Sequence, residues 1–494
     1  MKNINKCGIA GLVVMILMNF TSCKNSFLEI TPKSKLIAKT VADYDLLFNN
    51  LNLINTSGTS VTSLNTTPNY PNGQIPMGDE VISIDPYYSA AALRTERLFR
   101  WDDVIYDPEQ DSGEMTAIMT QLYTYNKIAN EVMSATNGTD AQRSALYGEA
   151  LANRAWCYFM LINYFGKPYN ASTAANDPGF PIITAADVAA TGFTRASVQQ
   201  VYDFMINDLK TAIPLLPQNV AINARLCKSA AEALLGKTYV FMGQYQNGLT
   251  YLNAAMSDLP TTITVALYNL NITMATGGTW GYVYTPTSYQ TLYPTAWVNT
   301  ENLFAKQANA GAWNSANSDI LLSPDAAALF KPSDVRLKFY SPQATGGGGY
   351  AVTGALRRAT GTQVQIGVRI ADLILLKAEC EARLNDLTSA KNDLEGFRKT
   401  RMPAADATVN ITDPTTMVKF IIDERTREFA VQGFRWFDMR RLSVDPIFAG
   451  TIYTHKLYSS TGALVNTFTL KADRLTLRFA QKVIDQNPGM SNNP

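Results

Sequence analysis

The sequence predicts an all-α fold, with tetratricopeptide-like helix pairs as a scaffold and long, irregular, loop-rich insertions between them. Two observations lead to this prediction. Apolar residues recur at intervals of three and four in several long segments, which is typical of amphipathic helices. By contrast, the stretch 261–365 has no long helical period and is rich in aromatic and small residues. A chain of 494 residues can hold such a scaffold as one large domain built from repeats.

The N-terminal residues have the pattern of an export signal. Two lysines precede an apolar run, Gly8–Met18, that is too short to cross a bilayer as a helix. Small residues then stand directly before Cys23, which resembles a bacterial lipobox, although Phe20 replaces the usual leucine. We therefore expect residues 1–22 to be a lipoprotein signal peptide and Cys23 to carry the lipid anchor. The alternative is a plain secreted protein in which Cys23 is incidental.

Helical and loop-rich segments alternate along the rest of the chain. A short polar tether is expected up to about Lys39, followed by a helix in the sequence VADYDLLFNNL. Residues 56–108 are rich in Ser, Thr, Asn, Gly and Pro, which predicts loops. The apolar period predicts further helical segments at 115–135, 142–165, 197–216 and 230–259, and again after residue 365.

The segment 230–259 carries the signature of a tetratricopeptide unit, and a second unit follows much later. The first unit has Leu235, Gly236 and Tyr239 in the L-G-x2-Y spacing. The later positions of both units carry small residues, large apolar residues or proline at the expected offsets: Gly248, Leu252 and Pro260 in the first, and Ala378, Ala390 and Leu394 in the second.

The residue totals argue against several classes of function. The 42 basic and 41 acidic residues nearly balance, so no long-range field would steer nucleic acid or an anionic membrane toward the chain. With a single histidine and no Cys-x-x-Cys spacing, we expect no zinc site and no cofactor, and we expect His455 to be an incidental surface residue. The cysteines that remain after export, Cys157, Cys227 and Cys380, are expected to be buried, unpaired small hydrophobes.

The most charge-dense motifs are DERTREF and RWFDMRR near the C-terminus. Arginines alternate with acids there at helical spacings that permit salt bridges, and such neighbours lower the pKa of a carboxyl group. A lowered pKa is the wrong direction for the general acid of a glycoside hydrolase. We therefore expect ion-paired helix ends and no enzymatic activity from the four acids of these motifs, Asp423, Glu424, Glu428 and Asp438.

Two loop-rich segments interleave aromatic and short polar residues: NYPNGQIPMGDEVISIDPYY (Asn69–Tyr88) and WGYVYTPTSYQTLYPTAW (Trp280–Trp297). A sugar ring stacks its C–H groups on an aromatic face, and its hydroxyl groups need fixed hydrogen bonds. The alternative is that these rings only pack the loops onto the helices. We expect the segments to converge into one exposed glycan platform, with stacking faces from Tyr70, Tyr87, Tyr88, Trp280, Tyr282 and Tyr284 and polar contacts from Asn69, Asp79 and Asp85.

Four further segments point to a known family: GEALANRAWCYFMLINYFGKPY (Gly148–Tyr169), VRIADLILLKAECEARLN (Val368–Asn385), DERTREFAVQGFRWFDMRRL (Asp423–Leu442) and RLTLRFAQKVIDQNPGM (Arg474–Met490). In this order, and behind a lipoprotein signal, they resemble the SusD/RagB family of outer-membrane nutrient-binding lipoproteins. The resemblance extends over the whole mature chain.

This resemblance implies a single α-helical domain, residues 23–494, with its ligand site on irregular segments opposite the scaffold. The N-terminal half would be 23–260, the loop-rich insert 261–365 and the C-terminal helical part 366–494. Such proteins are not catalysts. They bind oligosaccharides, or in some members peptides, and deliver them to a SusC-like TonB-dependent transporter.

We therefore expect a glycan-binding protein that is lipid-anchored in the outer membrane and faces the cell exterior. A peptide-binding member of the family is the main alternative. A surface glycoside hydrolase would lack recognisable catalytic motifs, and a tetratricopeptide interaction scaffold would leave the aromatic loops unexplained.

Overall fold

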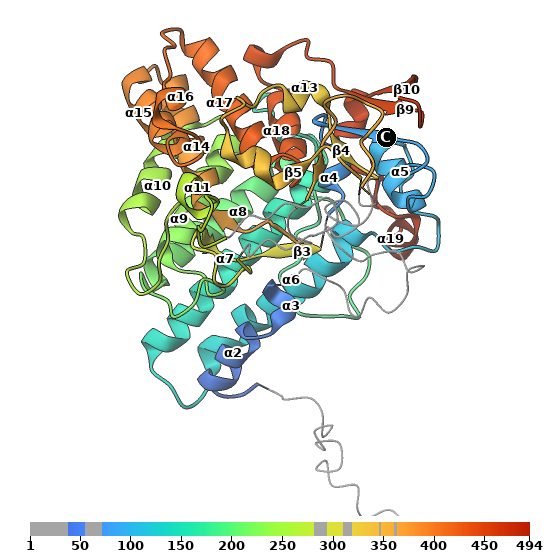
Figure 1. Cartoon of the computed structure of the whole chain (residues 1–494). Helices are drawn as coiled ribbons and strands as arrows, with labels where there is room; N and C mark the ends of the chain where they lie inside the picture. The colour runs from blue at the N-terminus through green and yellow to red at the C-terminus, as the bar shows by residue number, and fades with distance from the viewer. Residues whose placement is uncertain (1–37, 55–71, 281–293, 310–318, 345–346, 360–362) are drawn as a thin grey trace, which may run out of the picture.

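The structure, a computed structural model, is dominated by α-helices, so the helix-rich prediction is confirmed (Figure 1). It describes residues 38–54, 72–280, 294–309, 319–344, 347–359 and 363–494. Within these ranges, each helix is too short or too polar to cross a membrane.

The long helices of the N-terminal half pack on one another in sequence order: α6 (Gly113–Glu131), α7 (Asp140–Phe165), α8 (Val198–Ala212), α9 (Lys228–Phe241) and α10 (Tyr245–Ser257). Helix α7 forms the centre of this scaffold. It begins at a capping box on Thr139, and all its residues from Gly148 onward are buried. A helix that is buried on all sides belongs to the interior of a large core.

The repeat signature forms the contact between α9 and α10. The turn between these helices contains Gly243 at φ 72°, a left-handed conformation that glycine adopts without strain. A Cβ atom on Gly236 would stand 2.8 Å from Leu252 Cγ, and one on Gly248 would stand 2.9 Å from Val240 Cγ2. The absence of side chains at these two glycines therefore lets the helices approach closely.

The C-terminal part is a second group of helices: α14 (Ile370–Arg383), α15 (Leu387–Arg398), α17 (Pro414–Phe429) and α18 (Phe434–Leu442). Helix α14 connects the two halves because it packs against α10 as well as against α15 and α17. Buried apolar residues of α14, α15 and α17 form a core cluster of their own beside the main core.

The remaining α-helices are short: α2 (Val41–Phe48), α3 (Leu51–Ile54), α4 (Gln74–Met77), α5 (Leu93–Arg100), α11 (Leu270–Thr273), α13 (Pro324–Ala327), α16 (Ala404–Ala407) and α19 (Gln481–Gln486). Single 3-10 turns add η3 (Val132–Ser134), η4 (Ile213–Leu215), η5 (Val335–Phe339), η6 (Pro446–Phe448) and η7 (Ala472–Leu475).

The fold also contains short β-strands, which the all-α prediction leaves out. One sheet has the order β10-β9-β1-β4, in which β1 is parallel to β9 and the other neighbours are antiparallel. Among the described residues, three antiparallel pairs stand apart: β2 with β8, β3 with β7, and β5 with β6. The strands are β1 (Val81–Ile84), β2 (Asn302–Phe304), β3 (Gln307–Asn309), β4 (Leu321–Leu322), β5 (Tyr340–Ser341), β6 (Arg357–Arg358), β7 (Gln363–Gln365), β8 (Val368–Arg369), β9 (Thr454–Tyr458) and β10 (Leu464–Thr469).

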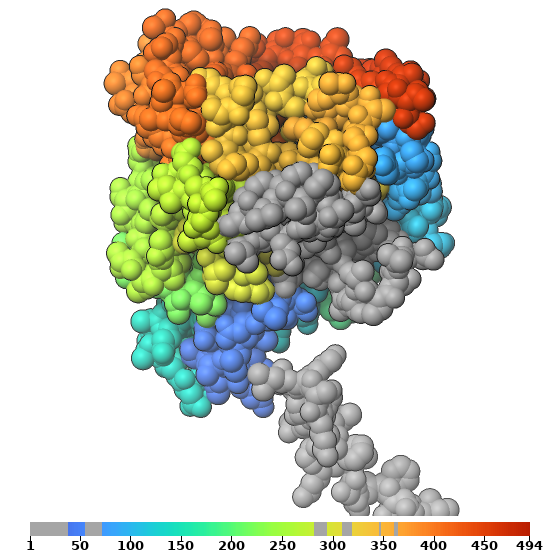
Figure 2. All heavy atoms as spheres, viewed as in Figure 1, coloured from blue at the N-terminus to red at the C-terminus, as the bar shows by residue number. Residues whose placement is uncertain are grey.

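The described residues of the insert 261–365 contribute short strands and turns, without a long helix. In Figure 2 the insert, yellow to light orange, forms part of the face toward the viewer. The C-terminal helices lie above it and α2 lies below it. The predicted bounds of the insert and its role as a ligand face stay predictions.

The three cysteines of the described chain are buried and unpaired, as predicted. Cys157 lies in α7 and Cys380 in α14, while Cys227 is the N-cap residue of α9. Burial raises the pKa of the Cys157 thiol to about 12, so this side chain is a neutral packing residue at neutral pH.

Candidate functional site

Four of the predicted ligand-binding residues lie at the two ends of one strand, β1. Asp79 precedes the strand, and Asp85, Tyr87 and Tyr88 follow it. Strand β1 pairs with β9 on one side and with β4 on the other, and both partners are distant in the sequence. The amide of Asp85 continues this pairing by donating to the carbonyl oxygen of Tyr458 at 2.9 Å. The sheet therefore fixes where these four side chains leave the backbone.

Tyr87 belongs to a group of half-buried tyrosines at the end of β1, which we name the tyrosine cluster: Tyr87, Tyr350 and Tyr458. The rings of Tyr87 and Tyr350 meet edge to face, with centroids 6.3 Å apart, and all three rings pack against the same small apolar cluster. Close to Tyr87 in the chain, Asp85 accepts a hydrogen bond of 2.6 Å from Ser89 Oγ. Partly exposed rings beside a carboxylate are the residue types that a saccharide site needs.

Two members of the tyrosine cluster, Tyr350 and Tyr458, are missed by the sequence prediction. Tyr458 reaches the site because it pairs with Ile84 across β1 and β9, and a local pattern in the sequence does not predict that pairing. Tyr350 follows directly after a glycine run. An aromatic residue next to a glycine-rich stretch is the one signal that could have pointed to it.

Tyr88 is directed into the core, unlike its neighbour Tyr87. Its side chain is 7% exposed and its ring lies against Phe99, with centroids 5.6 Å apart. Its hydroxyl accepts a hydrogen bond of 2.8 Å from Arg100 Nη1, and burial raises the pKa of Tyr88 to about 12. In this conformation the Tyr88 ring packs in the main core, and its predicted contact with a ligand stays a prediction.

Trp280 is also buried. The centroid of its ring lies 4.6 Å from that of Tyr268, at an interplanar angle of 60°, and 6.5 Å from that of Phe339. Its backbone amide donates to the carbonyl oxygen of Thr273, the last residue of α11, at 3.0 Å. The ring therefore packs between Tyr268 and Phe339 in this structure, and its predicted stacking role also stays a prediction.

The remaining predicted residues lie outside the described ranges: Cys23, Asn69, Tyr70, Tyr282 and Tyr284. Their predicted roles, and the predicted convergence of the two aromatic segments, therefore stay predictions.

Asp79 lines a polar cavity of about 250 Å³ next to β1. It is held there by Arg435, whose Nε and Nη2 donate to its two carboxylate oxygens at 2.5 and 3.0 Å. Burial would raise the pKa of Asp79, but the charge of Arg435 and its hydrogen bonds outweigh this effect and lower it. Thr426 and Lys456 contribute further polar groups to the wall. Asp79 is thus an ionised acceptor that is already oriented.

The next residue, Glu80, is buried and poorly satisfied. Its Oε1 accepts a hydrogen bond of 3.3 Å from the amide of Val431, whereas Oε2 has no hydrogen-bond partner among the described residues. Burial, together with the charge of Asp79, raises the pKa of Glu80 to about 8. Glu80 therefore carries a proton at neutral pH.

His455 is not the surface residue that the sequence predicts. It lies in β9, completely buried, with its ring stacked between Trp101 at 3.8 Å and Phe99 at 4.5 Å. Its ring nitrogens each lie 2.6 Å from a backbone carbonyl oxygen, that of Phe99 for Nδ1 and that of Gly78 for Nε2. Burial lowers the pKa of His455 to about 4. The prediction is wrong because strand pairing, which joins β9 to β1, carries the residue inside.

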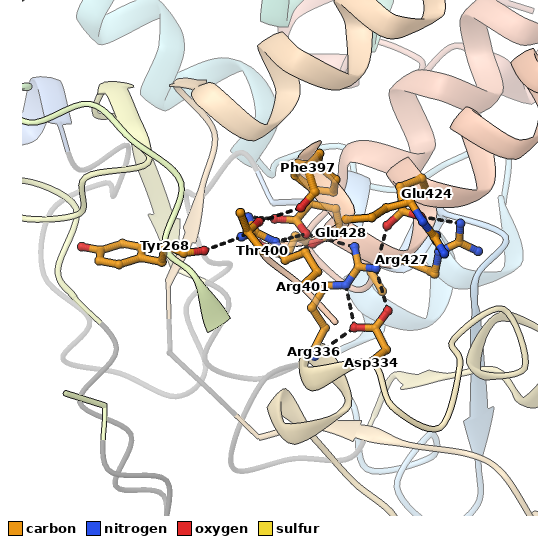
Figure 3. A network of polar contacts seen from close by, with 12 residues as sticks. Tyr268, Asp334, Arg336, Phe397, Thr400, Arg401, Glu424, Arg427 and Glu428 are labelled. Carbon is orange, nitrogen blue, oxygen red and sulfur yellow. Dashed lines mark hydrogen bonds and ion pairs between the residues drawn. The ribbon is translucent and has the colours of Figure 1, made fainter. Parts of the chain in front are cut away.

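The acids of the charge-dense motifs form buried ion pairs, as predicted for Glu424, Glu428 and Asp438. Figure 3 shows two of them, Glu424 and Glu428, among neighbouring arginines. Glu424 meets three guanidinium groups, from Arg336 and Arg427 at 2.6 Å and from Arg398 at 2.5 Å. Burial would raise the pKa of Glu424, but these charges lower it far below its usual range. Glu424 therefore cannot act as a general acid.

Asp423 differs from the other three acids of these motifs. It faces the cavity next to Asp79, and burial raises the pKa of its carboxyl group.

Among the described residues, the structure contains no group of three or more acidic, histidine or cysteine side chains that could hold a metal ion.

Comparison with known proteins gives matches in both halves of the chain. A family model described as starch-binding and associating with the outer membrane matches residues 27–240, and the SusD family model matches residues 350–494. A SusD-like protein from Formosa agariphila, P2, is 27% identical over 140 residues, which is 28% of this chain. The chain spans about a quarter of that relative's length, 26%.

Solved structures match over nearly the whole chain. A SusD superfamily protein from Bacteroides vulgatus superposes with a TM-score of 0.70 at 20% identity, covering 92% of this chain and 99% of the other. Another from Bacteroides thetaiotaomicron has a TM-score of 0.69 at 18% identity, with 92% and 100% covered. Matching family models at both ends and a shared fold in between lead to one conclusion: the chain belongs to the SusD family.

Proposed function

We propose that this chain is a surface-exposed lipoprotein that captures oligosaccharides and delivers them to a SusC-like TonB-dependent transporter in the outer membrane. The observation that carries the proposal is membership of the SusD family, through matches in both halves of the chain. One of the structural relatives, from Bacteroides vulgatus, is described as a SusD-like carbohydrate binding protein. Its TM-score is 0.60.

In this proposal the tyrosine cluster is the central part of the glycan site. Tyr87, Tyr350 and Tyr458 keep part of each ring exposed, so a sugar ring can stack on them without a rearrangement of the core. Asp85 lies close to Tyr87 in the chain as a hydrogen-bond acceptor. Asp79 lies at the other end of β1 and would be a second acceptor. The predicted residues outside the described ranges would extend the same surface.

The scaffold and the anchor complete the proposal. The helix pairs α9–α10 and α14–α15 would be tetratricopeptide-like units of a single domain, residues 23–494, because their signature residues form the close contacts within the first pair. Cys23 would carry the lipid that holds the domain at the outer membrane. The chain would act as a binding protein and not as an enzyme, since three of the four acids most suggestive of hydrolysis, Glu424, Glu428 and Asp438, are held in ion pairs.

A glycan array, run beside a panel of peptides of matched length, tests the binding specificity directly. We expect neutral oligosaccharides to bind and peptides to give no signal above background. Binding of peptides alone would replace the proposal by the peptide-binding alternative. Co-purification from native membranes in mild detergent tests the partner, because a β-barrel transporter should then accompany the chain.

A further inference from the structure

A groove of about 530 Å³ opens on the side of the molecule where α6, the segment 180–193 and α19 meet. Figure 1 shows α19 below the β9–β10 hairpin. The walls are mainly apolar, and we name the site the methionine groove after three of its lining residues: Met115, Met119 and Met490. Its volume lies within the range of small-molecule pockets.

Hydrogen bonds fix the walls of the methionine groove in position. Asn126 on α6 donates through Nδ2 to the carbonyl oxygen of Ile183 at 2.9 Å, which fixes one end of the segment 180–193. At the other end, the amide of Phe193 donates to Asn487 Oδ1 just after α19, also at 2.9 Å. The groove is therefore preformed, and a ligand that enters it does not have to order its walls.

Folding alone does not account for the apolar surface that is left open here. Val188, in the segment that borders the groove, is 86% exposed, and Tyr123 on α6 is 38% exposed. Leaving apolar area in water is unfavourable by roughly 25 cal/mol per Å². A contiguous apolar surface with a polar rim is typical of a binding site. The polar residues Thr116, Thr120 and Gln486 also line the groove.

The lining chemistry selects one kind of ligand. Aromatic rings from Tyr123, Phe193 and Phe479 stand with three thioether side chains, and both groups make favourable contacts with another aromatic ring. Asp187 is the only charged side chain among the described residues that line the groove. Its carboxylate would attract a cation and repel an anion, so a ligand with a negative charge is disfavoured.

We propose that the methionine groove binds a small aromatic molecule that is neutral or positively charged. This site is separate from the tyrosine cluster, which packs on a different apolar cluster around β1. It does not depend on the proposed glycan function, and failure of one proposal leaves the other standing.

The test uses the full mature chain and the neutral aromatic dye N-phenyl-1-naphthylamine, whose fluorescence rises in an apolar site. We expect saturable binding of one dye per chain. Met119→Glu should weaken this binding at least tenfold, because it places a carboxylate within the apolar wall. Val188→Asp should weaken it severalfold, and its position on the surface leaves folding intact, as circular dichroism would verify. The second variant keeps the test decisive if Met119→Glu fails to fold.

Two control variants and a second dye make the result specific. Leu46→Asp changes an apolar residue that is 56% exposed on α2, and Tyr87→Ala changes the tyrosine cluster; neither should alter dye binding. The cationic dye thioflavin T should bind wild type severalfold more tightly than Asp187→Asn. Dye affinity that is unchanged in both Met119→Glu and Val188→Asp, or that falls equally in Leu46→Asp or Tyr87→Ala, would overturn the proposal.

Discussion

Replacing Glu80 by glutamine should change how the stability of the protein depends on pH. Glu80 is 3% exposed, and one of its carboxylate oxygens has no hydrogen-bond partner among the described residues. Burial and the neighbouring charge of Asp79 raise the pKa of Glu80 from 4.5 to about 8. Over this range of pH the folded protein keeps a proton that the unfolded chain has already lost.

The sign and the size of the effect follow from this difference. Below pH 4.5 the carboxyl group of Glu80 is protonated in both states and contributes no pH dependence. As the pH rises from 4.5 to about 8, the unfolded state binds fewer protons than the folded state, so the free energy of unfolding falls. At about 1.4 kcal/mol per pH unit, the loss approaches an upper limit of about 5 kcal/mol. The E80Q variant has no titrating carboxyl group at this position, so its free energy of unfolding does not fall in this way.

Urea unfolding of wild type and E80Q, measured at about pH 5 and again at about pH 8.5, gives the two free energies of unfolding. At the lower pH, E80Q should be less stable by about 1–3 kcal/mol, because its amide N–H groups lack an acceptor. The difference should then move in favour of E80Q by several kcal/mol at the higher pH. Glu109→Gln, at an exposed site, is the matched control. A difference that stays constant with pH within about 0.5 kcal/mol would show that Glu80 does not keep its proton in the folded state.

Three further predictions concern other parts of the molecule. Glu424→Gln should lower the free energy of unfolding by about 3–5 kcal/mol, because three buried guanidinium groups lose a counter-charge; a loss below about 1 kcal/mol in urea unfolding would contradict this. Gly248→Ala should cost about 1–3 kcal/mol, because the added methyl group would stand 2.9 Å from Val240 Cγ2; an unchanged unfolding midpoint would show that α9 and α10 can separate freely. Cys23→Ala should shift the protein from the outer-membrane fraction to the soluble fraction, and continued membrane association without a transporter would argue against the lipid anchor.

The helical scaffold could be predicted from the sequence because its signal is local. The predicted helical segment 142–165 corresponds to α7 (Asp140–Phe165) within two residues at its start. The predicted segment 230–259 is two helices, α9 and α10, with a break at Gly243 that the prediction does not mark. Periodicity and glycine placement act within one or two turns of chain, so a single sequence is sufficient to reveal them.

The sheet and the tyrosine cluster could not be predicted in the same way. Strand β1 has only four residues, and its neighbour β9 lies far away in the sequence, near the C-terminus. Such pairing depends on the tertiary fold. For this reason the sequence analysis misses Tyr458 and wrongly expects His455, which is buried, to lie at the surface. Aromatic residues among short polar ones are a local feature, so composition alone is enough to propose Tyr87 as a ligand-binding residue.

The most direct test of the account is isothermal titration calorimetry of the oligosaccharide that the array identifies, with variants of the tyrosine cluster. Tyr87→Ala and Tyr350→Ala should each weaken binding by about two- to tenfold, which corresponds to about 0.5–1.5 kcal/mol per aromatic contact, while the melting temperature stays close to that of wild type. Tyr251→Ala, which removes a half-buried ring stacked on Tyr239 in the scaffold, should leave affinity unchanged. Unchanged affinity in both cluster variants, or a fall in melting temperature in place of a fall in affinity, would contradict a glycan site at the end of β1.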